Sequence, residues 1–168
     1  MLRKPEASET TGKEICQTLC EMVGVKNSAI SAYHFAPRSI EKVVETVGLV
    51  NSGYEVEEPE LLIPIRLAEE SGLWPPPEIL MESCLTPAGI ARLYSVPHAI
   101  EVHLITEDRT TGPVPCNLMI SEHEREVLIS DHLTSALKTS VEDFAEGLWR
   151  FRDEPLTKLR KREKPQHW

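Results

Sequence analysis

The architecture of this chain follows from one segment, Val43-Val44-Glu45-Thr46-Val47-Gly48-Leu49-Val50-Asn51-Ser52-Gly53-Tyr54. Residues 43–50 are mostly apolar or β-branched, which is the composition of a strand. The strand runs directly into Asn51-Ser52-Gly53. A tight turn by itself accounts for this tripeptide, since asparagine and glycine both tolerate positive φ. The segment therefore predicts a strand that ends in a polar turn.

Short strands and turns continue on both sides of that segment. Ala29–Phe35 and Lys42–Val50 flank a turn-forming Ala36-Pro37-Arg38-Ser39 and predict an antiparallel hairpin. Further short strands are expected at Leu61–Ile63, Glu78–Leu85, Ala91–Ser95, Ala99–Thr106, Val114–Ile120 and Glu126–Ile129. Short helices are expected from Pro64 to Gly72 and after a cap at Ser130 or Asp131. Many strands and few helices are typical of a mainly β fold, either a small closed barrel or a sandwich.

The chain is predicted to hold one β domain with an extension at each end. Residues 1–27 form an N-terminal extension with one amphipathic helix at 12–23. The apolar face of that helix repeats at helical spacing through Ile15, Leu19, Met22 and Val23. Residues 28–140 form the β domain, which is long enough to bury a core.

The C-terminal residues 141–168 are predicted to add a helix and a basic tail. The helix is expected around Phe144–Phe151, and the residues after it are expected to be loosely held. We interpret the basic run Lys158–Lys164 as a solvated tail that lies against an acidic body. A targeting or RNA-binding signal is the alternative interpretation of this run.

The net charge of −9 is unevenly distributed along the chain. Residues 1–50 carry six basic and six acidic side chains, residues 51–150 carry six and 18, and residues 151–168 carry six and three. An acidic body repels phosphate backbones, which argues against nucleic acid as a partner. The hydrophobic content of 40% and the charged content of 27% are those of an ordinary globular protein.

The sequence is expected to contain no membrane-spanning segment, no disulfide and no metal site. The N-terminus has no apolar segment resembling a signal peptide, and no run is long enough to span a bilayer. A cytoplasmic location is therefore expected, in which the four cysteines stay reduced and pack as small apolar residues. Neither the cysteines nor the histidines show the spacing of a zinc site, so no metal ion or other cofactor is expected.

Two later motifs follow the Asn51-Ser52-Gly53 turn. Glu82–Ser95 predicts a hairpin, and Leu128-Ile129-Ser130 leads into the second short helix. In this order, the elements of residues 28–138 resemble a protomer of the retropepsin-like aspartic proteases. That family has an Asp-Thr/Ser-Gly turn, a flap hairpin and a hydrophobic-hydrophobic-Gly motif followed by a helix. The segment Pro59–Leu73 is also similar to stand-alone microbial and archaeal members of the family.

The resemblance implies a small closed β-barrel of the retropepsin-like type, with short helices and an added N-terminal helix. It places Asn51, Ser52 and Gly53 in the catalytic position. It also implies a substrate-binding flap with three residues at its tip, Pro87, Ala88 and Gly89. A protomer with one motif supplies one catalytic side chain, so the resemblance implies a homodimer with a peptide or protein as its ligand.

Two residues depart from the family pattern: Asn51 stands at the catalytic Asp position and Ser130 at the motif Gly position. Aspartic proteases hold two carboxylates that share one proton, so that one activates water while the other protonates the substrate carbonyl. An amide cannot take up a proton near neutral pH, and hydrolysis is therefore expected to be lost or impaired. Three routes to activity stay open: an engineered replacement of Asp, deamidation of Asn51, or a carboxylate supplied by a partner chain.

These observations favour two functions. The first is an aspartic-peptidase-like homodimer that holds an extended peptide between flap and barrel by main-chain hydrogen bonds. The second is a non-enzymatic interaction or scaffold protein that dimerises through the same domain. An unrelated small β-barrel without a peptide groove is a third interpretation.

Overall fold

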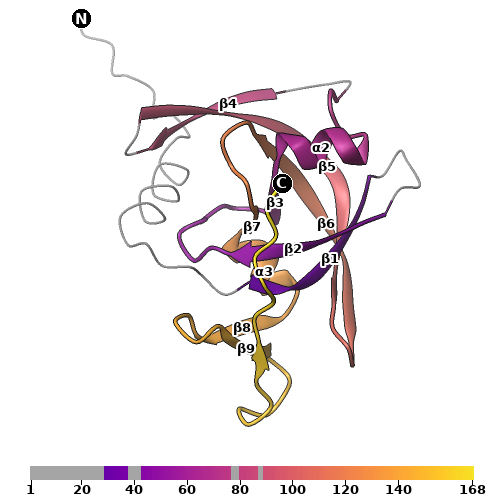
Figure 1. Cartoon of the computed structure of the whole chain (residues 1–168), viewed down its shortest axis with the longest axis vertical. Helices are drawn as coiled ribbons and strands as arrows, with labels where there is room; N and C mark the ends of the chain where they lie inside the picture. Colours follow the sequence, from indigo (N-terminus) through magenta and orange to yellow (C-terminus); the bar gives the residue numbers. More distant parts are fainter. Residues whose placement is uncertain (1–28, 38–42, 77–79, 87–88) are drawn as a thin grey trace, which may run out of the picture.

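The computed structural model describes residues 29–37, 43–76, 80–86 and 89–168 of the chain (Figure 1). The predicted helix at 12–23 lies outside the described residues. The same holds for Pro87 and Ala88, which the sequence places at a hairpin tip.

Strands make up most of the described residues. They are β1 (Ala29–Pro37), β2 (Val44–Val50), β3 (Glu60–Pro64), β4 (Leu80–Thr86), β5 (Gly89–Ile105), β6 (Thr110–Ser121), β7 (Val127–Ile129), β8 (Thr139–Asp143), β9 (Leu148–Phe151) and β10 (Arg160–Lys161). The two described helices are α2 (Ile65–Ser71) and α3 (Asp131–Ala136). The mainly β class predicted from the sequence is confirmed.

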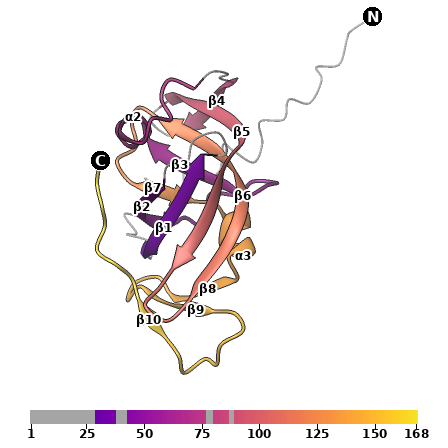
Figure 2. The same ribbon diagram turned by 90° about the vertical axis from the view of Figure 1, so that its right-hand side faces the viewer.

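The described strands form two sheets. Seven strands pair in the order β1-β2-β7-β3-β6-β5-β4, and β1 also pairs with β5. Three strands pair in the order β10-β9-β8. Figures 1 and 2 both show this smaller sheet at one end of the larger one, with the β4–β5 hairpin at the opposite end.

The central strands of the larger sheet bury both of their faces. The main core is made of buried apolar side chains from β2, β3, α2, β5, β6, β7, α3 and β9, and a second apolar cluster is made of Tyr54, Leu62, Leu93, Met119 and Leu128. In β3, Leu61 and Ile63 belong to the main core, whereas Leu62 belongs to the second cluster. β7 alternates in the same way, with Leu128 in the second cluster. Successive side chains of a strand point to opposite faces, so these continuous apolar runs indicate strands covered on both sides.

Both predicted short helices are confirmed. α2 begins after Pro64 and ends at Gly72, whose φ of 75° lies in the left-handed region that glycine adopts most readily. Leu67 packs α2 against the main core. α3 begins after Ser130, whose side chain accepts a hydrogen bond from the Leu133 N–H. Neither described helix has the length and apolar character needed to cross a bilayer.

β5 unites two strands that the sequence predicts as separate, Ala91–Ser95 and Ala99–Thr106. Its pairing with β6 changes register between Val96 and Ile100, where His98 has a positive φ of 49°. A bulge of this kind lets one strand continue through irregular residues. The long β5 therefore joins the β4–β5 hairpin directly to the sheet.

The predicted helix around Phe144–Phe151 is wrong, because β8 and β9 form an antiparallel hairpin there. The buried rings of Trp149 and Phe151 are two residues apart, which is the period of a strand. The Asp143 carboxylate accepts a backbone hydrogen bond within the turn, and Gly147 has a φ of 67°. This turn chemistry and the burial of alternate aromatic rings outweigh the helical pattern.

The C-terminal tail is held more firmly than the sequence predicts. β10 pairs with β9, and the Arg162 N–H donates a hydrogen bond to the Gly147 carbonyl oxygen (2.8 Å). Further along, the Gln166 side-chain oxygen accepts a hydrogen bond from the Val47 N–H (3.1 Å). Trp168 packs against the main core. These contacts tie the tail to β2 and β9.

Candidate functional site

The Asn51-Ser52-Gly53 turn lies at the end of β2 and is fixed by its own side chain. Asn51 is only 2% exposed, and its Oδ1 atom accepts a hydrogen bond from the Gly53 N–H (3.0 Å). The Asn51 carbonyl oxygen accepts from the Tyr54 N–H (3.0 Å), and the Asn51 N–H donates to the Ile129 carbonyl oxygen (3.2 Å). The structure therefore holds Asn51 and Gly53 in a buried turn, while Ser52 is exposed.

The second predicted motif lies directly beside this turn. β2 and β7 run parallel, with Val50 opposite Ile129. The Asp131 N–H donates to the Tyr54 carbonyl oxygen (3.0 Å), and Asp131 Oδ1 accepts from the Val56 N–H (3.3 Å). Two segments that are far apart in the sequence are thus joined at the ends of two parallel strands.

Ser130 connects this site to β3 and α3. Its buried hydroxyl oxygen accepts hydrogen bonds from the Leu133 N–H and the Glu60 N–H, both at 3.1 Å. Its own N–H donates to the Glu60 carbonyl oxygen (3.2 Å). A glycine here, as in the family that the sequence resembles, would lack the hydroxyl. The serine therefore acts as a helix cap and as a link between strands.

A buried carboxylate, Glu60, lies next to Tyr54 and was not singled out from the sequence. Its neighbours in the sequence, the glutamates of residues 55–58, are typical of a solvated acidic loop, but Glu60 is only 7% exposed. The Tyr54 hydroxyl donates a hydrogen bond to Glu60 Oε2 (2.9 Å). The position of Glu60 at the start of the apolar run 61–63 was the signal that could have revealed its burial.

Cys116 confirms the prediction for a buried cysteine. It is 1% exposed and belongs to the main core. Burial, with a smaller effect of the Glu60 carboxylate, raises the pKa of the Cys116 thiol far above its usual range. The thiol therefore stays neutral and packs as a small apolar side chain.

β4 and β5 form the hairpin that the sequence predicts as a flap, and they pair antiparallel over the whole of β4. Of the substrate-binding candidates, Gly89 begins β5, whereas Pro87 and Ala88 lie outside the described residues. The hairpin exposes three large apolar side chains: Leu80 (59%), Met81 (59%) and Ile90 (73%). Exposed apolar side chains on a projecting element are suited to contact with another molecule.

Asp108, in the turn between β5 and β6, forms ion pairs with the basic tail. Lys158 Nζ lies 2.6 Å from Asp108 Oδ2, and Arg160 donates to both carboxylate oxygens at 3.0 and 2.9 Å. These hydrogen bonds, with a further one from Thr106, hold the pKa of Asp108 far below its usual range. The predicted contact between basic tail and acidic body is confirmed here.

Among the described residues, no group of three or more His, Cys, Asp or Glu side chains is arranged to hold a metal ion.

No protein-family model matches this chain, and no curated protein is significantly similar to it. The chemistry of the site therefore has to be inferred from its own groups. The Asn51 amide can donate and accept hydrogen bonds but cannot transfer a proton near neutral pH. The turn supplies a rigid polar contact at the end of a strand, without an acid or a base of its own.

Proposed function

We propose that this chain is an aspartic-peptidase-like homodimer that binds extended peptides, with hydrolysis lost or impaired because Asn51 replaces the catalytic Asp. The observation that carries the proposal is the meeting of the two motif segments at the ends of the parallel strands β2 and β7. The Asn51 N–H donates to the Ile129 carbonyl oxygen at this point, and the Gly53 N–H orients the Asn51 side chain. These hydrogen bonds hold the Asn51 side chain in a fixed position, which acid–base chemistry requires of a catalytic side chain.

The sheet arrangement supports a fold of the retropepsin-like type. β3 follows the turn and lies between β6, to which it is parallel, and β7, to which it is antiparallel. In this proposal the strands are a small barrel in which β1 pairs with both β2 and β5. The β4–β5 hairpin then supplies a flap, and a peptide between flap and turn gains main-chain hydrogen bonds.

The proposal requires two copies of the chain. Each copy has one turn of this kind, so two copies around a two-fold axis complete the site. Two Asn51 amides at that axis provide no general base. Loss of acid–base catalysis alone lowers a rate by ~10²–10⁴-fold. The dimer therefore binds peptides rather than cleaving them.

The test is Asn51→Asp, with Gln166→Glu as a matched control. Both changes convert an amide into a carboxylate, but Gln166 lies on the C-terminal tail, where it accepts a hydrogen bond from Val47. We expect a dimeric mass for all three proteins, and cleavage of a mixed peptide library at a pH of about 4–6 only with Asn51→Asp. A monomeric mass, or a dimeric Asn51→Asp variant that neither binds nor cleaves peptides, would contradict the proposal.

A non-enzymatic dimeric interaction protein is the second candidate function. The exposed apolar side chains of the β4–β5 hairpin favour it, because they suit a folded protein partner as well as a peptide. In that case Asn51→Asp dimerises without cleavage, whereas replacing Leu80 and Met81 by serine weakens the dimer. Peptide cleavage by the Asn51→Asp variant, together with sedimentation of the Leu80 and Met81 variant against protein concentration, separates the two functions.

A further inference from the structure

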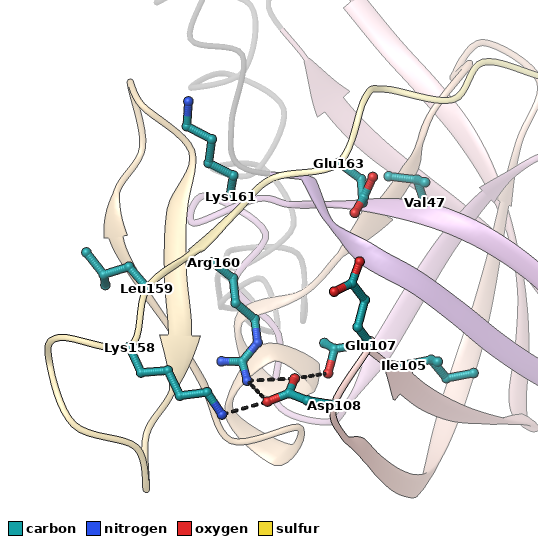
Figure 3. Close-up of a pocket in the computed structure, with 10 residues that line it drawn as sticks. Val47, Ile105, Glu107, Asp108, Lys158, Leu159, Arg160, Lys161 and Glu163 are labelled. Carbon is teal, nitrogen blue, oxygen red and sulfur yellow. Dashed lines mark hydrogen bonds and ion pairs between the residues drawn. The ribbon is translucent and has the colours of Figure 1, made fainter.

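An open cavity of about 720 Å³ lies between the β5–β6 turn and the C-terminal tail (Figure 3). Val47 of β2, Ile105 and Glu107 line one side of it, and residues of the tail between 158 and 163 line the other. Val47 precedes Asn51 by four positions, so at ~3.3 Å per residue the cavity is roughly 13 Å along β2 from the candidate site. The cavity is therefore separate from that site.

Two of the three cationic side chains that line the cavity are paired within the protein. Arg160 forms ion pairs with Asp108 and Glu154, and Lys158 pairs with the same two carboxylates. Figure 3 shows the Lys161 side chain pointing away from Glu107. The positive charges of Arg160 and Lys158 are offset by the negative charges of Asp108 and Glu154. They therefore do not neutralise the other carboxylates that line the cavity.

Two carboxylates, Glu107 and Glu163, remain for a ligand. Both are exposed and line the cavity, and neither has a hydrogen bond or ion pair to another described residue. Figure 3 shows both near Val47, with Glu107 coming from the β5–β6 turn and Glu163 from the tail across the cavity. Together with the apolar side chains of Val47 and Ile105, they suit a ligand that is cationic and partly apolar.

The tail also offers an open strand edge at this cavity. β10 pairs with β9 through Arg160 opposite Trp149, and the Arg162 N–H donates to the Gly147 carbonyl oxygen (2.8 Å). Hydrogen-bonded residues alternate in an antiparallel pair, so the N–H and C=O of Lys161 point away from β9. Among the described strands, β10 is the last of its sheet and has β9 as its neighbour. Its outer edge can therefore accept another strand.

We propose that this cavity binds an extended, basic peptide segment of a partner protein. The segment adds a strand to β10 through the main-chain groups of Lys161 and places a lysine or arginine side chain between Glu107 and Glu163. Alternate side chains of the peptide contact Val47 and Ile105. This inference does not rest on the chemistry of Asn51, and the two sites are tested by different variants.

The test titrates the full-length protein into a fluorescein-labelled octapeptide of alternating lysine and valine, with fluorescence anisotropy as the readout. We expect binding that weakens at high salt. A peptide with acetylated lysines should bind about fivefold more weakly, which is the worth of two solvent-exposed ion pairs. N-methylation of alternate backbone amides should also weaken binding, because it removes donors for strand addition.

The double variant Glu107→Gln, Glu163→Gln should weaken binding of the lysine peptide by the same factor. The matched control is Glu69→Gln, Glu146→Gln, which removes two exposed carboxylates outside the cavity and should leave the affinity unchanged. Equal binding of the acetylated peptide, or unchanged affinity of the cavity variant, would overturn the proposal. N-methylation without effect would overturn strand addition to β10. Unfolding midpoints of both double variants confirm that they are folded.

Discussion

Ser130→Ala removes the hydroxyl that joins the candidate site to β3 and α3. Two buried backbone donors, the Leu133 N–H and the Glu60 N–H, then lose the acceptor that each meets at 3.1 Å. Loss of a helix N-cap costs about 1 kcal/mol, and a buried N–H without a partner costs about 1–3 kcal/mol. Because both effects act at one site, we expect the free energy of unfolding to fall by about 2–4 kcal/mol.

Urea unfolding followed by tryptophan fluorescence measures this loss, because Trp149 is fully buried. With a slope of about 2 kcal/mol per molar urea, the unfolding midpoint should fall by roughly 1–2 M. Ser135→Ala is the matched control, since it removes an exposed hydroxyl from the same helix and should cost less than about 0.5 kcal/mol. If the two variants shift the midpoint equally, the bridging role assigned to Ser130 is wrong.

Two further predictions concern the C-terminal sheet. Hydrogen bonds from Arg160, and then Lys158, lower the pKa of Glu154 from its ordinary value of 4.5 to about 2. The stability that Glu154 contributes is therefore present above about pH 4.5 and lost as the pH falls through about 2, and Glu154→Gln should flatten this part of an acid-unfolding curve. Gly147→Ala forces alanine to a φ of 67° and brings its Cβ against the Arg162 side chain. The free energy of unfolding, measured by thermal unfolding, should therefore fall by more than about 1 kcal/mol. Gly72→Ala has a similar φ of 75°, but no atom lies within 4 Å of its added Cβ, so it should lower the free energy of unfolding by less. A larger loss for Gly72→Ala than for Gly147→Ala would contradict the predicted clash with Arg162.

The sequence by itself determined those elements whose signals are local. The β-branched run before Asn51 predicted β2, and the Asn-Ser-Gly chemistry predicted the turn that ends it. Gly72 marked the end of α2, and Ser130 marked the start of α3. In each case the residue acts on the backbone of its immediate neighbours, so no distant contact is needed to recognise it.

The candidate site was predicted only in part. The sequence placed Asn51 and Ser130 in two motifs, but the parallel pairing of β2 with β7 is what brings them together. It missed the burial of Glu60, which depends on Tyr54 and on the strand beside it. Neither strand carries a signal for which strand it pairs with, because the partner lies far away in the chain.

The C-terminal region shows most clearly what the tertiary structure alone decided. Residues around Phe144–Phe151 carry a pattern compatible with a helix, yet Trp149 and Phe151 are buried as alternate residues of β9. The tail from Lys158 onward contains no strong local signal, and its order comes from pairing with β9 and from ion pairs with Asp108 and Glu154. Local propensities differ by less than the free energy of burying two aromatic rings, so contacts between distant residues determine the structure there.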